Sequence, residues 1–136
     1  MSITFADFQQ ASTRTLKDRA LRVGDHPATS EALVLGALGL AGEAGEAVEH
    51  VKKHVFHSRP LDREALAKEI GDVLWYLSAL ATGAGLDLGA CAEGNIEKLR
   101  KRYPDGFTPQ ASVERADETP RRSSSIDDEI ARIVVG

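Results

Sequence analysis

The fold of this chain is decided by the stretch Gly42-Glu43-Ala44-Gly45-Glu46, which places two carboxylates three residues apart within an apolar segment. A second stretch, Lys68-Glu69-Ile70-Gly71-Asp72, repeats the spacing and leads into another apolar run. Side chains three residues apart on a helix project from the same face, about one turn from each other. The sequence therefore predicts two helices that each carry an acidic pair on a face suited to packing.

Acidic pairs of this kind favour a metal site. A carboxylate on a buried helical stripe is costly unless it is paired or bound to a cation. Four of them would raise each other's pKa unless a divalent cation balanced their charge. If the two helices pack antiparallel with their axes ~8–10 Å apart, Glu43, Glu46, Glu69 and Asp72 can face one another. Oxygen ligands suit Mg²⁺ or Mn²⁺, which also bind phosphate oxygens, and a carboxylate not committed to metal could take the proton of an attacking water.

The acidic residues admit other interpretations. A lone acidic pair is usually a solvated helix face, but two pairs, each beside glycine in an apolar helix, favour a site. A di-iron bundle needs Glu-x-x-His on two helices, and no histidine here follows a glutamate by three residues. The single cysteine, Cys91, has no histidine nearby in sequence, which argues against a nucleophilic hydrolase.

Composition bounds the class of protein. The chain has 136 residues, 42% of them apolar, and a net charge of -4, which argues against a nucleic-acid binder. One cysteine excludes an internal disulfide. No apolar run approaches the ~20 residues that span a bilayer, and the N-terminus lacks the basic start of a signal peptide. We therefore expect a cytoplasmic protein without a membrane partner.

The apolar periodicity predicts four helices joined by short loops, and no segment alternates as a strand would, so no sheet is expected. The helices are expected over residues 4 to about 22 with Thr4 as N-cap, 30 to about 55, 63 to 82 after Asp62, and 88 to about 102 after Asp87. Glycines at 36, 39, 42 and 45 disfavour the second helix by ~1 kcal/mol each relative to alanine. Close approach of a neighbouring helix or a ligand would account for them.

These elements predict an all-α fold, an antiparallel helical bundle. Aromatic residues make up only 5% of the chain, so its own core should be thin and completed by oligomerisation. Residues 1–107 are expected to form the domain. Residues 108–136 read as a polar linker followed by a short helix around Ile126 to Val134 or by a frayed tail.

The order of the motifs resembles a known family. Three motifs follow one another: Glu43-x-x-Glu46, Glu69-x-x-Asp72 and Asn95-x-x-Lys98, the last leading into Arg102-Tyr103-Pro104-Asp105-Gly106-Phe107. Their residues and spacing are similar to those of the MazG-like all-α NTP pyrophosphohydrolases. The resemblance covers roughly residues 3 to 107. A single ExxE motif would be weak evidence for this family, whereas both acidic pairs followed by this basic helix end are specific for it.

The resemblance implies hydrolysis of a nucleoside or deoxynucleoside triphosphate between the α and β phosphates, with cleansing of the nucleotide pool as the expected role. It implies that Glu43, Glu46, Glu69 and Asp72 bind Mg²⁺, and that homodimers or homotetramers form. Substrate contacts are implied for Lys53, Tyr76, Asn95, Lys98 and Arg102. Composition alone would assign the basic residues at helix ends to the helix dipole.

Two alternatives stay open at this point. Tyr76 follows Asp72 by one helical turn, where its ring could stack on a base or fill the core of the bundle. The whole chain could also be a non-catalytic helical module that binds nucleotides or a partner protein.

Overall fold

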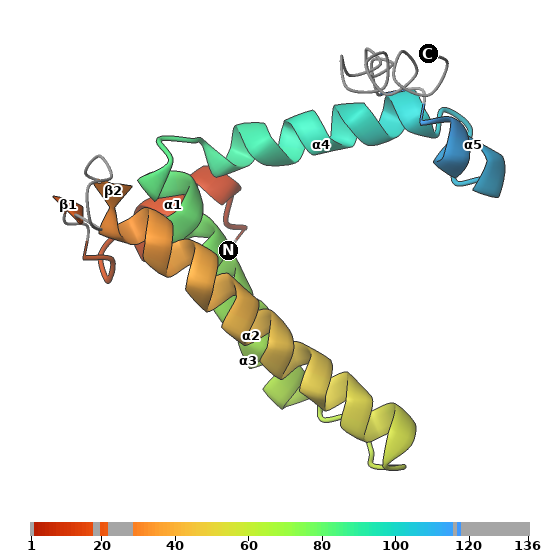
Figure 1. The fold of residues 1–136 in the computed structure, drawn as a ribbon, viewed down its shortest axis with the longest axis horizontal. Coiled ribbons are helices and arrows are strands. Elements are labelled where there is room, and N and C mark those ends of the chain that lie inside the picture. The colour runs from red at the N-terminus through yellow and green to blue at the C-terminus, as the bar shows by residue number, and fades with distance from the viewer. Residues whose placement is uncertain (1, 18–19, 22–28, 116, 118–136) are drawn as a thin grey trace, which may run out of the picture. The chain divides into compact units, whose positions relative to one another are not determined.

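Residues 2–17, 20–21, 29–115 and 117 are described by the computed structural model shown in Figure 1. The chain divides into two units, Met1–Ala92 and Glu93–Gly136. The described residues are mainly helical, as the sequence predicts, and each unit is considered by itself.

The first unit is built on two long helices, α2 (Glu31–Phe56) and α3 (Arg63–Gly83), which lie side by side (Figure 1). Leu33 lies next to Gly83, Gly36 next to Leu80, and Gly39 next to the ring of Tyr76. Residue numbers thus rise along one helix as they fall along the other. The predicted antiparallel arrangement of the two acidic helices is confirmed.

The close approach of α2 and α3 depends on glycine. A Cβ built on Gly36 would lie 2.5 Å from the backbone nitrogen of Leu80, and one on Gly83 would lie 2.3 Å from that of Leu33. Neither distance is tolerable, because both contacts are with backbone. By contrast, a Cβ on Gly42 or Gly45 would meet no atom of the described chain within 4 Å. Helix packing therefore explains Gly36, and also Gly39 beside the Tyr76 ring, but it does not explain Gly42 or Gly45.

The predicted helix starts are confirmed by their caps. Ser30 Oγ accepts a hydrogen bond from the Leu33 N–H at 3.2 Å, and Asp62 Oδ1 accepts one from the Ala65 N–H at 3.0 Å. Asp87 Oδ1 accepts one from the Ala90 N–H at 2.7 Å at the start of α4 (Leu88–Arg102). Each carboxylate or hydroxyl satisfies a main-chain donor that has no partner within its helix.

The N-terminal region departs from the prediction. Helix α1 (Phe5–Ser12) begins at the predicted cap, where Thr4 and Asp7 form a capping box, but it ends ten residues earlier than expected. The hydroxyls of Ser12, Thr13 and Thr15 each donate to a main-chain carbonyl three residues back, which competes with continuation of the helix.

A short antiparallel pair follows α1, formed by β1 (Ala20–Leu21) and β2 (Thr29–Ser30), with Ala20 opposite Ser30. The prediction that the chain has no sheet was therefore wrong. Two-residue strands are too short to show an alternating pattern in the sequence.

The second unit holds most of α4 and the short helix α5 (Pro109–Glu114). Helix α5 lies within the segment expected to be a polar linker, where the sequence predicts no helix before residue 126. Thr108 caps α5, Pro109 occupies its first turn, and Arg115 ends it with a φ of 48°. The helix or tail predicted around Ile126 to Val134 lies outside the described residues.

The described part of the chain has a thin core. The fully or nearly buried residues are small: Ala32, Gly36, Ser78, Ala79 and Ala81. Large apolar side chains on α2 remain exposed, Leu38 at 72% and Phe56 at 78%. No single helix among the described residues is long and apolar enough to cross a membrane.

The two kinds of glycine in α2 should respond oppositely to alanine. Gly36→Ala should destabilise the protein by about 1–3 kcal/mol, because the new methyl overlaps the backbone of α3. Gly42→Ala should stabilise it by about 0.5–1 kcal/mol through helix propensity. Chemical denaturation of the two variants beside the wild type measures both changes. Equal effects of the two substitutions would contradict the close packing at Gly36.

Candidate metal centre

Three carboxylates from two helices converge where α2 and α3 face each other. Glu43 comes from α2, and Glu69 and Asp72 come from adjacent turns of α3. One oxygen from each lies within 4.8 Å of the others. The antiparallel register brings them together, because Glu43 lies one turn beyond Gly39 and Asp72 lies one turn before Tyr76.

The electrostatics of this cluster disfavour three ionised groups. Desolvation raises the pKa of Glu43, and the charges of Glu46, Asp72 and Glu69 raise it further. Glu43 and Glu69 are half-buried, whereas Glu46 and Asp72 are exposed. The prediction that all four acids lie on a buried stripe is therefore wrong for Glu46 and Asp72.

Glu46 lies outside the group of three oxygens, although its charge still acts on Glu43. His50 lies one turn beyond Glu46 on α2, beside α3. Its Nε2 lies 3.6 Å from Glu69 Oε1, a salt bridge when the imidazole is protonated. The sequence placed His50 on the same face as Glu43 but assigned it no role, since nothing indicated which residue of α3 it would meet.

The backbone around the carboxylates is open. A Cβ on Gly42, Gly45 or Gly71 would meet nothing within 4 Å in the described part of the chain. These three glycines flank Glu43, Glu46 and Asp72 in sequence. All three are exposed, so no contact within the described part of the chain explains the absence of a side chain at these positions.

The ring of Tyr76 packs directly on α2. An added Cβ at Gly39 would lie 2.0 Å from its Cε1 atom. The ring also meets the indole of Trp75 edge-on, with centroids 5.0 Å apart and planes at 87°. Tyr76 is half-buried, so it contributes to helix packing while keeping part of its surface exposed one turn from Asp72.

Lys53 is held on the surface of α2. Its ammonium lies 3.6 Å from Glu49 Oε1, and Lys52 contacts the other oxygen of the same carboxylate. The hydrogen bond from Lys52 lowers the pKa of Glu49. This arrangement matches the solvated ion pair that helix spacing alone predicts for these residues.

The other predicted substrate contacts, Asn95, Lys98 and Arg102, belong to the second unit, on α4. Asn95 and Lys98 are exposed. Arg102 is engaged by Asp117: its Nε donates to Oδ1, and Nη2 donates to Oδ2 at 2.7 Å. Their side chains are 13% and 3% exposed, and the hydrogen bond from Arg102 lowers the pKa of Asp117.

Sequence reasoning missed Asp117. It lies beyond the resemblance, fifteen residues after its partner, in a segment that looks uniformly polar. No periodic signal connects the two residues, because the turn at Arg115 that precedes Asp117 depends on a single left-handed residue.

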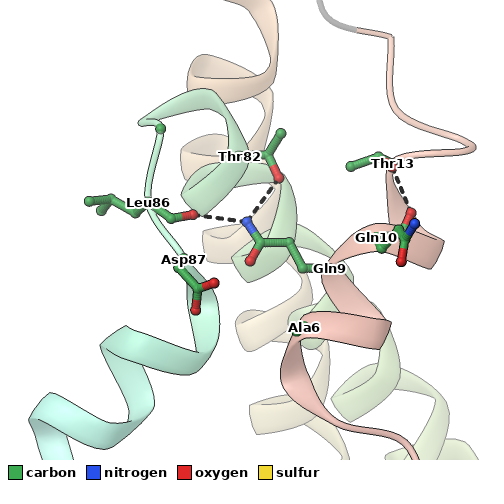
Figure 2. Close-up of a pocket in the computed structure, with 8 residues that line it drawn as sticks. Ala6, Gln9, Gln10, Thr13, Thr82, Leu86 and Asp87 are labelled. Atoms are coloured by element: carbon green, nitrogen blue, oxygen red, sulfur yellow. Dashed lines mark hydrogen bonds between the residues drawn. The ribbon is translucent and has the colours of Figure 1, made fainter.

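One further pocket lies at the other end of α3, between that helix and α1 (Figure 2). It has a volume of about 530 Å³. Gln9 crosses it: Nε2 donates to Thr82 Oγ1 at 3.3 Å and to the Leu86 carbonyl at 2.9 Å, and Oε1 accepts from the Leu88 N–H at 2.8 Å. Because the Gln9 amide is committed to these bonds, its role here is to join elements of the first unit.

The raised pKa of Glu43 predicts how stability changes with pH. Its charged form is disfavoured in the folded state, so the metal-free protein loses stability as the pH rises through this pKa. Glu43→Gln removes that charge and should raise the melting temperature in EDTA at neutral pH. The gain should vanish below roughly pH 4.3, where the glutamate is protonated in both states.

Glu64→Gln is the control, since Glu64 is an exposed residue of α3 whose carboxylate lies 3.2 Å from Lys68. It should give no gain at neutral pH. Differential scanning calorimetry over a pH series compares the variants. A Glu43→Gln variant less stable than the wild type at neutral pH in EDTA would contradict repulsion within the cluster.

Comparison with known proteins agrees with the geometry. The family model for the MazG nucleotide pyrophosphohydrolase domain matches residues 32–107, which include all four acids. No curated protein and no solved structure matches the chain. The matched residues make up more than half of the sequence, and the chain belongs to the MazG nucleotide pyrophosphohydrolase domain family.

Proposed function

We propose that this protein hydrolyses a nucleoside or deoxynucleoside triphosphate between the α and β phosphates, giving the monophosphate and pyrophosphate. The observation that carries the proposal is the convergence of Glu43, Glu69 and Asp72 within the residues that match the family. We propose nucleotide-pool cleansing as its role, and residues 1–107 as the extent of the catalytic domain.

The cluster fits a divalent cation such as Mg²⁺ or Mn²⁺. Two oxygens bound to one Mg²⁺ lie at most about 4.2 Å apart, twice the metal–oxygen distance. Oxygens already within 4.8 Å need only small rotations to reach this geometry. We propose Glu43, Glu46, Glu69 and Asp72 as the ligand set, with the exposed Glu46 completing it. When bound there, a divalent cation supplies charge that balances phosphate and lowers the pKa of a water.

The carboxylates have a second task in this proposal. Hydrolysis needs a group that orients the attacking water and accepts its proton. A glutamate of the set that is not fully committed to metal performs this step from within hydrogen-bonding distance.

The remaining groups bind the substrate. We propose that the exposed part of the Tyr76 ring stacks on the base, an interaction worth about 1–3 kcal/mol. We propose Lys53, Asn95, Lys98 and Arg102 as further contacts, with the cations on the phosphates. For Lys53 and Arg102 this requires that phosphate replaces the carboxylates of Glu49 and Asp117.

The activity is tested with a panel of canonical and modified triphosphates in the presence of Mg²⁺, with the products resolved by phosphorus NMR. We expect monophosphate and pyrophosphate from at least one substrate, and no turnover in excess EDTA. Orthophosphate with a diphosphate would refute the proposed bond. Lack of turnover with every substrate would favour a non-catalytic binding module.

Asp72→Asn tests the ligand set. Loss of a residue that merely supports a metal ligand costs 10- to 100-fold, so loss of a ligand should lower kcat about 100-fold or more. Helical content measured by circular dichroism should stay near that of the wild type, because Asp72 is exposed. Glu64→Gln, on the same helix but away from the cluster, should leave kcat unchanged. A fully active Asp72→Asn enzyme would remove this residue from the site.

The exposed apolar side chains predict assembly. We propose a homodimer or homotetramer in which Leu38, Val48 and Phe56, exposed at 72%, 63% and 78%, become covered. Light scattering should give at least twice the chain mass at micromolar concentration, and Leu38→Asp should lower it. Val113→Asp, an equally exposed site on α5, is the control. A stable and active wild-type monomer would contradict the assembly.

A further inference from the structure

A row of side-chain hydrogen bonds joins the N-terminal segment to α3. Gln9 bonds to Thr82 at 3.3 Å, Ser12 to Ser78 at 2.5 Å between their Oγ atoms, and Thr15 accepts from the indole N–H of Trp75 at 2.9 Å. Figure 2 shows the first of these bonds. Each step moves three residues along the N-terminal segment and about one turn back along α3. The row therefore runs towards Asp72.

Thr15 makes the last bond of this row. Its Oγ1 accepts the Trp75 N–H and at the same time donates to the Ser12 carbonyl at 3.0 Å. The second bond orients the hydroxyl, so that a lone pair faces the indole. The N–H of a half-buried indole normally has a hydrogen-bond partner. Here the partner is Thr15 Oγ1, and the bond fixes the orientation of the ring.

The orientation of Trp75 is passed on to Tyr76. The two rings meet edge-on at 5.0 Å, and the Tyr76 ring also packs against the backbone of α2 at Gly39. A rotation of the indole would remove one of the two contacts that define where the Tyr76 ring lies. The described geometry thus links Thr15, outside the residues matched by the family, to a ring one turn from Asp72.

We propose that Thr15 is a positioning residue for the nucleoside side of the site, acting through Trp75 on Tyr76. This inference rests on the proposed function, in which Tyr76 stacks on the base. The N-terminal segment then preorganises the aromatic surface and contributes to binding of the nucleoside, while the carboxylates act on the phosphates independently. Preorganisation of this kind improves affinity because less freedom is lost when the ligand binds.

The experiment compares Thr15→Val with Thr13→Val. Valine keeps the shape of threonine without its hydroxyl. Thr13 also donates to a carbonyl three residues back, at 2.6 Å, so its variant loses the same kind of local bond without touching Trp75. Thr15→Val should raise KM for the triphosphate about threefold to tenfold, the range for loss of one hydrogen bond, with kcat and the Mg²⁺ dependence unchanged. Thr13→Val should leave KM unchanged.

Trp75→Phe completes a double-mutant cycle, because it removes the N–H but keeps an aromatic ring. If the bond acts as proposed, the double variant has a KM no higher than that of the more impaired single variant. Additive effects on KM, or a change in kcat as large as that in KM, would overturn the proposal. If the wild type hydrolyses triphosphates and the Thr15→Val variant has the same KM, the role of Thr15 is refuted while the proposed function stands.

Trp75 is the single tryptophan of the chain, so its fluorescence gives a readout without turnover. Titration with the four deoxynucleoside monophosphates should change the wild-type emission, and Thr15→Val should weaken that binding about threefold to tenfold. Titration with inorganic pyrophosphate and Mg²⁺ should give equal affinities for both proteins, because it lacks a nucleoside. Equal weakening for pyrophosphate would indicate a general structural effect and overturn the proposal.

Discussion

The close antiparallel contact between α2 and α3 is the constraint on which the rest of the first unit depends. Where Gly36 and Gly83 meet the opposite backbone, no side chain could be accommodated. This contact sets both the spacing and the register of the two helices. With the register set, Glu43 lies opposite Glu69 and Asp72, and Tyr76 lies on Gly39. The site is therefore a consequence of packing between residues that carry no chemistry themselves.

Glu43 differs from Glu49 and Asp117 in the charges that surround it. Glu49 has Lys52 and Lys53 beside it, Asp117 has Arg102, and the pKa of each acid is lowered. Around Glu43, desolvation and every neighbouring charge that acts on it raise the pKa. Glu49 and Asp117 thus each have a cation beside them, whereas the charges that act on Glu43 where α2 and α3 meet are negative. The divalent cation that we propose for this site would offset that negative charge, and its binding would then stabilise the fold.

Polar and small residues make contacts that larger apolar residues make in most domains. The buried Ser78 is joined to Ser12, and Gln9 spans α1, Thr82 and the start of α4. Hydrogen bonds are directional, so they hold the N-terminal segment in one register along α3. These hydrogen bonds add little stability compared with burial of apolar side chains. Large apolar side chains of α2 remain exposed. The first unit is accordingly well defined in geometry but modest in core.

The long helices and their caps could be predicted from the sequence, because helical periodicity and capping are local. The short connection between α2 and α3 also predicted that they run antiparallel. Sequence patterns overextended α1, missed the two-residue ladder and missed α5, since hydroxyl-to-backbone bonds and single-residue turns leave no periodic trace. Only the tertiary structure showed that three acids converge while Glu46 remains outside the group, that Asp117 engages Arg102, and that Thr15 holds Trp75. Those contacts join residues far apart in the chain, and their partners follow from the register of packed helices and from turns, which no local pattern encodes.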